Sequence, residues 1–151
     1  MGLTRGVSGR PETAYCNAWQ PRSNQLTHDV LLTDFLLCYP LAEIVRGWQV
    51  DSRIRPDAEM TVAGQKFFVE LDTGEQTYRQ IRHRQRAYAA VRDLLLYVTV
   101  SETRLAGLMR HSSAVESIAL FTTLDRVMRD PRGEVWVDFA GKTVSLKAGA
   151  S

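Results

Sequence analysis

The chain has few cysteines and no long apolar run. Its two cysteines, Cys16 and Cys38, show no metal-ligand spacing, and a disulfide between them is not expected in a reducing cytoplasm. The longest apolar run covers residues 30–39 and is interrupted by Thr33 and Asp34, so we predict no segment that spans a bilayer. The first residues lack the apolar core of a signal peptide, which predicts a cytoplasmic protein. Internal repeats, zinc-binding spacings, phosphate-binding glycine loops and Ser/His/Asp arrangements are also missing from the sequence.

The length and composition indicate one globular domain preceded by a short arm. With 151 residues, 44% apolar and 24% charged, the chain is long enough for a single core. Residues 1–24 are rich in Gly, Pro, Arg, Ser and Asn and predict an extended arm, which leaves residues 25–151 as the folded domain. Within the arm, residues 9–15 (GRPETAY) resemble the β-hairpin wing of winged-helix DNA-binding domains. The arm is either a remnant of such a domain or an accidental match.

Positive charge is concentrated in one segment, although the net charge is only +2. Residues 79–92 contain no acidic side chain, and Asp93 follows directly. A basic strip of this kind neutralises phosphates and predicts contact with nucleic acid; the alternative is a solvated helix face. The basic residues of the strip are Arg79, Arg82, His83, Arg84, Arg86 and Arg92.

Apolar periodicity and turn residues predict an α/β domain, with a central mixed sheet and helices on both faces. Thr27 is the expected N-cap of a first helix that ends near Pro40, and residues 41–46 either extend it or begin a second turn. Two further helices are expected at residues 75–93 and 101–110. The expected strands are 48–53, 57–62, 65–72, 94–100 and 118–124, followed by a C-terminal hairpin of 134–139 and 142–146.

Three carboxylates lie at the ends of two adjacent strand segments. Asp57 follows Arg55-Pro56, and Glu70 and Asp72 end the strand 65–72, where alternation places both on one face. If Asp57 lies beside them on the neighbouring strand, the three acids converge. Mg²⁺ and Mn²⁺ favour such sites, with carboxylate oxygens and room for water and phosphate. Without a metal, converging carboxylates repel one another and at least one pKa rises. The pattern predicts metal-assisted phosphodiester chemistry.

The order of these elements resembles the PD-(D/E)XK nuclease superfamily, which has the restriction-endonuclease-like fold. Within that superfamily the chain is similar to the replication-relaxation family of plasmids and mobile elements. The resemblance extends from about Leu26 to Met128 and rests on the order and spacing of short motifs. These motifs are residues 26–30 (LTHDV), 54–57 (IRPD), 68–75 (FVELDTGE), 84–88 (RQRAY), 96–98 (LYV) and 121–124 (FTTL).

The resemblance implies a metal-dependent DNA nuclease or nickase in which Asp57 and Glu70 bind Mg²⁺ or Mn²⁺. Asp72 stands where the superfamily usually has lysine, and we expect it to be a further metal ligand. Arg84 stands where the family often has lysine, so Arg84 or Gln85 is expected to position the scissile phosphate or the attacking water. The metal would lower the pKa of a bound water and stabilise the charged phosphorane.

The resemblance also implies DNA contacts, and several of the residues have structural alternatives. The expected nucleic-acid contacts are His28, Arg79, Arg82, Arg84 and Arg86. His28 is alternatively a hydrogen-bonded structural group at the start of a helix, and Tyr88 is expected in the core. Asp72 is alternatively the cap of the helix that follows it. Asp34 lies beyond His28, where first-helix acids approach the metal site in some superfamily members.

The missing lysine leaves a second function open. It is a catalytically inactive DNA-binding accessory protein in replication, mobilisation or transcription, on the same fold. A third is a protein-interaction module, in which the C-terminal hairpin with Trp136 and Phe139 supplies an edge for a homodimer.

Overall fold

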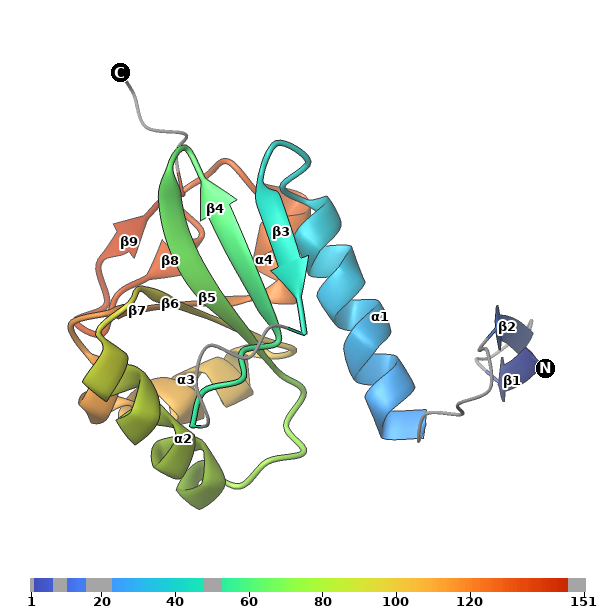
Figure 1. Ribbon diagram of the computed structural model, residues 1–151, viewed down its shortest axis with the longest axis horizontal. Helices are drawn as coiled ribbons and strands as arrows, with labels where there is room; N and C mark the ends of the chain where they lie inside the picture. The colour runs from blue at the N-terminus through green and yellow to red at the C-terminus, as the bar shows by residue number, and fades with distance from the viewer. Residues whose placement is uncertain (1, 7–10, 16–22, 48–52, 147–151) are drawn as a thin grey trace.

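The computed structural model describes residues 2–6, 11–15, 23–47 and 53–146 (Figure 1). Among these residues, seven strands form one mixed sheet flanked by helices, which confirms the α/β class. The strands of the sheet are β3 (Glu43–Arg46), β4 (Ala58–Val62), β5 (Gln65–Asp72), β6 (Leu95–Thr99), β7 (Ala119–Thr123), β8 (Trp136–Val137) and β9 (Thr143–Val144). The helices are α1 (Ser23–Leu37), α2 (Tyr78–Val91), α3 (Glu102–Arg110), the 3-10 helix η1 (Ser113–Val115) and α4 (Leu124–Arg129).

The seven strands lie side by side in sequence order. β3, β4 and β5 form an antiparallel meander, β5, β6 and β7 are parallel, and β8 and β9 continue the sheet antiparallel. Parallel neighbours need a crossover connection, which α2 supplies between β5 and β6 and α3 between β6 and β7. Asp72 and Thr99 are register partners, so the last residues of β5 and β6 meet at one edge of the sheet.

Side-chain alternation in the central strands divides the core into two layers. On β5, Val69 and Leu71 pack with residues of α1 and α4, whereas Phe68 packs with residues of α2, α3 and η1. Figure 1 shows α2 and α3 together, away from α1. Because successive strand residues face opposite ways, Glu70 and Asp72 lie on the same side as Phe68 and face α2 and α3.

Side-chain caps set the start of both crossover helices. Thr77 begins α2 with a capping box: its Oγ1 accepts from Gln80 N at 3.2 Å, and Gln80 Oε1 accepts from Thr77 N at 2.8 Å. Ser101 begins α3, where its Oγ accepts from Arg104 N at 3.1 Å. The two caps therefore fix where the β5–α2 and β6–α3 connections end.

The predicted ranges agree with the structure through the middle of the chain. β4, β5, β6 and β7 lie within the predicted strands, and α2 and α3 lie within the predicted helices. The turn between β4 and β5 is at Ala63 and Gly64, both with positive φ, and the pair is antiparallel as expected.

The prediction was wrong nearer the N-terminus and after β7. α1 begins at Ser23, before the expected cap Thr27, and residues 43–46 form the edge strand β3 instead of extending the helix. α4 was not predicted; Thr123 ends β7 and also caps α4, since its Oγ1 accepts from Arg126 N at 3.2 Å. The strand expected at 48–53 falls mostly on residues outside the described ranges, and Arg53 lies in a bend.

The N-terminal arm contains a hairpin. β1 (Gly2–Gly6) and β2 (Pro11–Tyr15) pair antiparallel, so the last five residues of the wing-like segment form a strand. Gly9 and Arg10 of that segment lie outside the described residues. The winged-helix interpretation of this arm stays a prediction.

The structure describes one of the two cysteines, Cys38. Cys38 is a free cysteine, packs against the core on the α1 side and donates its thiol hydrogen to Asp34 O at 3.3 Å. Cys16 lies outside the described residues. No helix in the described part of the chain has the length and apolar character needed to cross a bilayer.

Candidate functional site

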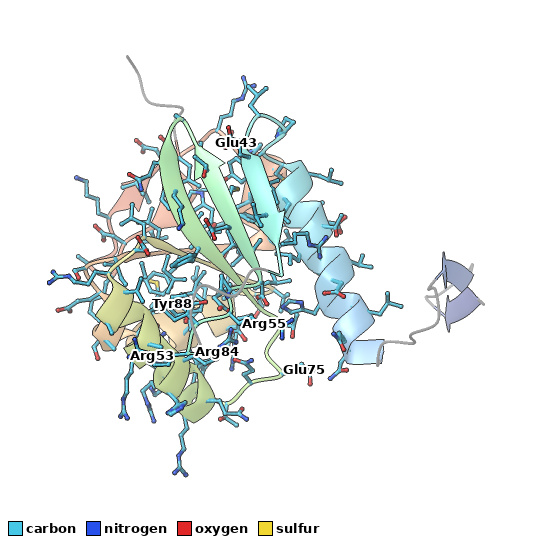
Figure 2. The ribbon with its side chains drawn as sticks, viewed as in Figure 1. Glu43, Arg53, Arg55, Glu75, Arg84 and Tyr88 are labelled. Carbon is cyan, nitrogen blue, oxygen red and sulfur yellow. The ribbon has the colours of Figure 1, made fainter. Side chains whose placement is uncertain are left out.

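Glu70 is the most buried of the three predicted site acids. Its side chain, 5% exposed, lies against α2. Arg84 Nη2 donates to Glu70 Oε1 at 2.6 Å and to Oε2 at 2.8 Å, and the Tyr88 hydroxyl also donates to Oε1. Arg84 and Tyr88 are labelled in Figure 2. Burial, and after it the charge of Asp57, raises the pKa of Glu70 to about 8, while Arg84 and Tyr88 act in the opposite direction.

Asp72 is held by α3. Arg104 Nε donates to Asp72 Oδ2 at 2.5 Å and Arg104 Nη2 donates to Oδ1 at 3.0 Å, a bidentate pair whose carboxylate is 6% exposed. The backbone N–H of Gly74 donates to Asp72 Oδ1 at 3.1 Å. The alternative in which Asp72 caps the next helix is wrong, because Thr77 caps α2. Asp72 instead ties the end of β5 to α3.

Asp57 is held between β5 and α1. Its Oδ2 accepts from Leu71 N at 2.8 Å and from His28 Nε2 at 3.2 Å. His28 Nε2 also lies 3.2 Å from Leu71 O, so Nε2 carries a hydrogen, since both neighbours are acceptors. The hydrogen bond with Asp57 raises the pKa of His28 to about 9, and Asp29, 3.6 Å from Nδ1, adds to this. His28 is therefore a cation at neutral pH.

The three carboxylates thus have three different cationic partners. Asp57 pairs with His28, Glu70 with Arg84, and Asp72 with Arg104. Within residues 23–47 and 53–146, no group of three or more His, Cys, Asp and Glu side chains is placed to hold a metal ion. N–H donors contact both carboxylate oxygens of Glu70 and of Asp72, and Oδ2 of Asp57.

A cavity of about 300 Å³ brings several predicted site residues together. His28, Asp57, Asp72 and Arg84 line it, at the end of β5. Glu70 does not line this cavity and instead borders a void of about 10 Å³. These four side chains are ion-paired, whereas Glu75, which also lines the cavity, forms no ion pair with the described residues.

A second cavity, of about 550 Å³, is lined by the same His28 and Asp57. Arg55 and Arg46 also line it. Arg55 is exposed and forms no ion pair with the described carboxylates (Figure 2). The shared residues place this arginine next to the acid site.

The predicted nucleic-acid contacts of α2 divide between its two sides. Ile81, Gln85 and Tyr88 are buried, and Arg84 points inward with them to reach Glu70. Arg79, Arg82, His83 and Arg86 are exposed on the opposite side, which we call the α2 basic face. Arg82 Nη1 hydrogen-bonds to His111 Nδ1 at 2.7 Å. None of the three exposed arginines forms an ion pair with a carboxylate of the described residues.

Two predicted residues are not brought to the cavities near Asp57. Gln85 is fully buried; its Nε2 donates to Ser112 Oγ at 2.7 Å, and its Oε1 has no hydrogen-bond partner among the described residues. Asp34 lines a separate hollow between α1 and β3. Neither side chain lines the two cavities beside Asp57.

Sequence reasoning missed Arg104 and Arg55. Arg104 lies in the first turn of α3, after the strand that neighbours β5, and only the pairing of β5 with β6 brings it to Asp72. Arg55 directly precedes Pro56-Asp57 in the sequence motif, and this position next to the acid is the signal that could have identified it.

Comparison of the chain with protein-family models, curated proteins and solved structures finds no match.

Proposed function

We propose that the protein binds DNA through phosphate contacts and does not cleave it. One observation carries this proposal: each site acid already has its own cationic partner, whereas the arginines of the α2 basic face have no carboxylate partner in the described chain. Arginines without a carboxylate partner remain available to an anionic ligand.

The α2 basic face suits a phosphate backbone. Arg79, Arg82 and Arg86 are spaced three and four residues apart, so they follow one side of the helix. No acidic residue interrupts α2, and each guanidinium offers a planar set of donors that matches phosphate oxygens. The face therefore offers several charges to consecutive phosphates.

The biological setting rests on the resemblance stated above. It suggests a restriction-endonuclease-like fold and a cytoplasmic accessory role in replication, mobilisation or transcription of a plasmid, phage or other mobile element. The antiparallel β4–β5 pair, the parallel β5–β6 pair and the intervening α2 support this fold assignment.

A metal-dependent nuclease is the second candidate. The observation in its favour is that Asp57, Asp72 and Arg84 line the same cavity of about 300 Å³. Arg84 and Arg104 would have to leave Glu70 and Asp72 before those carboxylates became free to bind Mg²⁺ or Mn²⁺.

Fluorescence anisotropy with a labelled DNA duplex tests the first proposal. Between about 50 and 200 mM salt, log affinity should fall linearly with log salt, and replacing Arg79, Arg82 and Arg86 by Ala should reduce that slope by about 2–3. The matched control replaces Arg126, Arg129 and Arg132, which gives the same charge change around α4. Equal loss in both variants would contradict a specific role for α2.

Incubation of supercoiled plasmid with Mg²⁺ or Mn²⁺ separates the two candidates. We expect no nicking by the native chain, and we expect Glu70→Gln to bind DNA as tightly as the native protein. Metal-dependent nicking that disappears in Glu70→Gln would replace the first proposal by the second.

A further inference from the structure

Two arginines line the larger of the two cavities beside Asp57 and have no carboxylate partner in the described chain. This cavity, of about 550 Å³, is bordered by α1, by the end of β3 and by the segment that leads into β4. Arg46 and Arg55 are both exposed, and neither forms an ion pair with a described carboxylate. Guanidinium groups without a carboxylate partner in a concave site indicate that the site takes an anion.

Strand pairing brings the two arginines to the same end of the sheet. Arg46 is the last residue of β3 and is the register partner of Ala58, the first residue of β4. Arg55 belongs to the short segment that leads directly into Ala58, so both arginines lie where the β3–β4 pair ends. Side chains from two separate segments therefore line one cavity.

The chain around each arginine is anchored, although the arginine side chain is exposed. Ile54 and Pro56, on either side of Arg55, are both buried. Arg46 Nη1 donates to Thr33 Oγ1 at 2.8 Å, which holds the guanidinium beside α1 and leaves its other N–H groups without a described acceptor. Anchoring of this kind reduces the conformational entropy that a ligand has to overcome on binding.

The charges around the cavity favour an anion over a cation. His28 is a cation, and it lies 3.2 Å from Asp57 Oδ2 and, through Nδ1, 3.6 Å from Asp29 Oδ1. Asp57 Oδ2 also accepts from the backbone N–H of Leu71 at 2.8 Å. One cation therefore lies between the two carboxylates of the cavity. The two arginines add two further positive charges, so the lining residues carry one positive charge in excess.

We propose that Arg46 and Arg55 bind a phosphate monoester in this cavity, either a free nucleotide or the 5′-phosphate at the end of a DNA strand. A phosphate monoester carries about 1.5 to 2 negative charges at neutral pH and has three acceptor oxygens, which two guanidinium groups match. A phosphodiester within a strand carries one charge and is matched less well. The proposal does not rest on DNA binding by the α2 basic face, because a free nucleotide occupies the same site.

The adjoining cavity of about 300 Å³ has room for the rest of such a ligand. Gln25, His28 and Asp57 line both cavities, so the two are neighbours. The smaller cavity is also lined by Glu75, which accepts hydrogen bonds, and by Gln76, whose amide group donates and accepts them. The hydroxyl groups and base edge of a nucleoside suit this polar lining better than an apolar body does.

Isothermal titration calorimetry of the full chain with dAMP tests the proposal, and deoxyadenosine is the matched ligand that lacks only the phosphate. We expect dAMP to bind at least about tenfold more tightly than deoxyadenosine. Arg55→Ala and Arg46→Ala should each weaken the binding of dAMP at least about tenfold. Arg132→Ala removes the same charge from an exposed arginine that lines a different cavity, so this control variant should bind dAMP as the native chain does. Circular dichroism confirms that each variant is folded.

A pair of oligonucleotides distinguishes the two sources of the phosphate. The chain used has Arg79, Arg82 and Arg86 replaced by Ala, so the α2 basic face does not contribute. If a strand end is the ligand, a single strand with a 5′-phosphate should bind more tightly than the same strand with a 5′-hydroxyl, and Arg55→Ala should remove the difference. Binding of dAMP without such a difference assigns the site to free nucleotides. Failure to bind either phosphate monoester, or binding that Arg55→Ala and Arg46→Ala leave unchanged, would overturn the proposal whether or not the native chain binds duplex DNA.

Discussion

Arg84 donates from a single nitrogen, Nη2, to both carboxylate oxygens of Glu70, at 2.6 and 2.8 Å. The two side chains come from elements that the β5–α2 connection brings together, and the carboxylate is 5% exposed while the guanidinium is 35% exposed. The pair therefore joins a buried acid to a partner at the cavity wall. It accounts for how a carboxylate is retained within an apolar strand.

Removing the arginine should destabilise the fold through the acid left behind. A fully buried pair broken on one side costs about 3–5 kcal/mol; because Arg84 is partly solvated, we expect about 2 kcal/mol for Arg84→Ala. Urea unfolding measures the change in the free energy of unfolding. Arg86→Ala, on the exposed side of the same helix, should change it by less than about 0.5 kcal/mol.

The double variant identifies the cause. Because Glu70→Gln removes the carboxyl group that lacks a partner, Glu70→Gln with Arg84→Ala should be more stable than Arg84→Ala alone. If the second substitution only adds to the loss, then Arg84 stabilises the protein by packing rather than by pairing with Glu70.

Stability should also fall at alkaline pH because of His28. Its hydrogen bond with Asp57 raises its pKa from 6.5 to about 9, so the folded chain holds the proton more tightly than the unfolded chain. This stabilisation is complete below pH 6.5 and is lost as the pH rises through 9. The loss should be at most about 3 kcal/mol, by the free energy of one pKa unit.

Urea unfolding of the native chain and of His28→Gln across this pH range measures that loss. Glu70 also has a raised pKa, to about 8, and lowers stability as the pH rises from 4.5, but it is present in both chains. Because the charge of His28 lowers the pKa of Glu70, the difference between the chains reports the loss of the His28 cation together with its effect on Glu70. Parallel pH profiles would show that the Asp57–His28 pair contributes no stability.

The sequence predicted the centre of the fold better than its edges. β5 and β6 are buried along most of their length, and the buried residues of α2 recur at helical spacing. Both features are visible in the sequence as apolar runs or apolar periodicity. β3 is exposed at every position and has no such pattern. α4 follows β7 without a loop. In the sequence, Thr123 was therefore assigned to the strand and not recognised as the N-cap of a helix.

The site was predictable in residue type but not in pairing. Strand alternation correctly placed Glu70 and Asp72 on one face. The cations that hold the acids come from distant parts of the chain: Arg104 is 32 residues from Asp72, and His28 is 29 residues from Asp57. No local spacing encodes those contacts, because they depend on how α1 and α3 pack on the sheet.

A close contact between Gly107 and Tyr78 fixes how α3 packs against the start of α2. Gly107 lies directly under Tyr78, and a Cβ at position 107 would collide with the Tyr78 hydroxyl and ring. Tyr78 cannot yield freely, since its ring stacks on His111 at 4.4 Å and Arg104 lies over it, also at 4.4 Å. Arg104 in turn holds Asp72.

Gly107→Ala should therefore lower the free energy of unfolding by about 1–3 kcal/mol, as expected when a close contact is overpacked. Tyr78→Phe removes the atom nearest to the new methyl group, so in the double variant it should recover part of the loss. Ala106→Ser, at the exposed neighbouring position, should have little effect. Thermal unfolding compares the four chains. A Gly107→Ala variant as stable as the native protein would mean that Tyr78 moves aside without breaking the Arg104–Asp72 clamp, and α3 would then not be fixed through this contact.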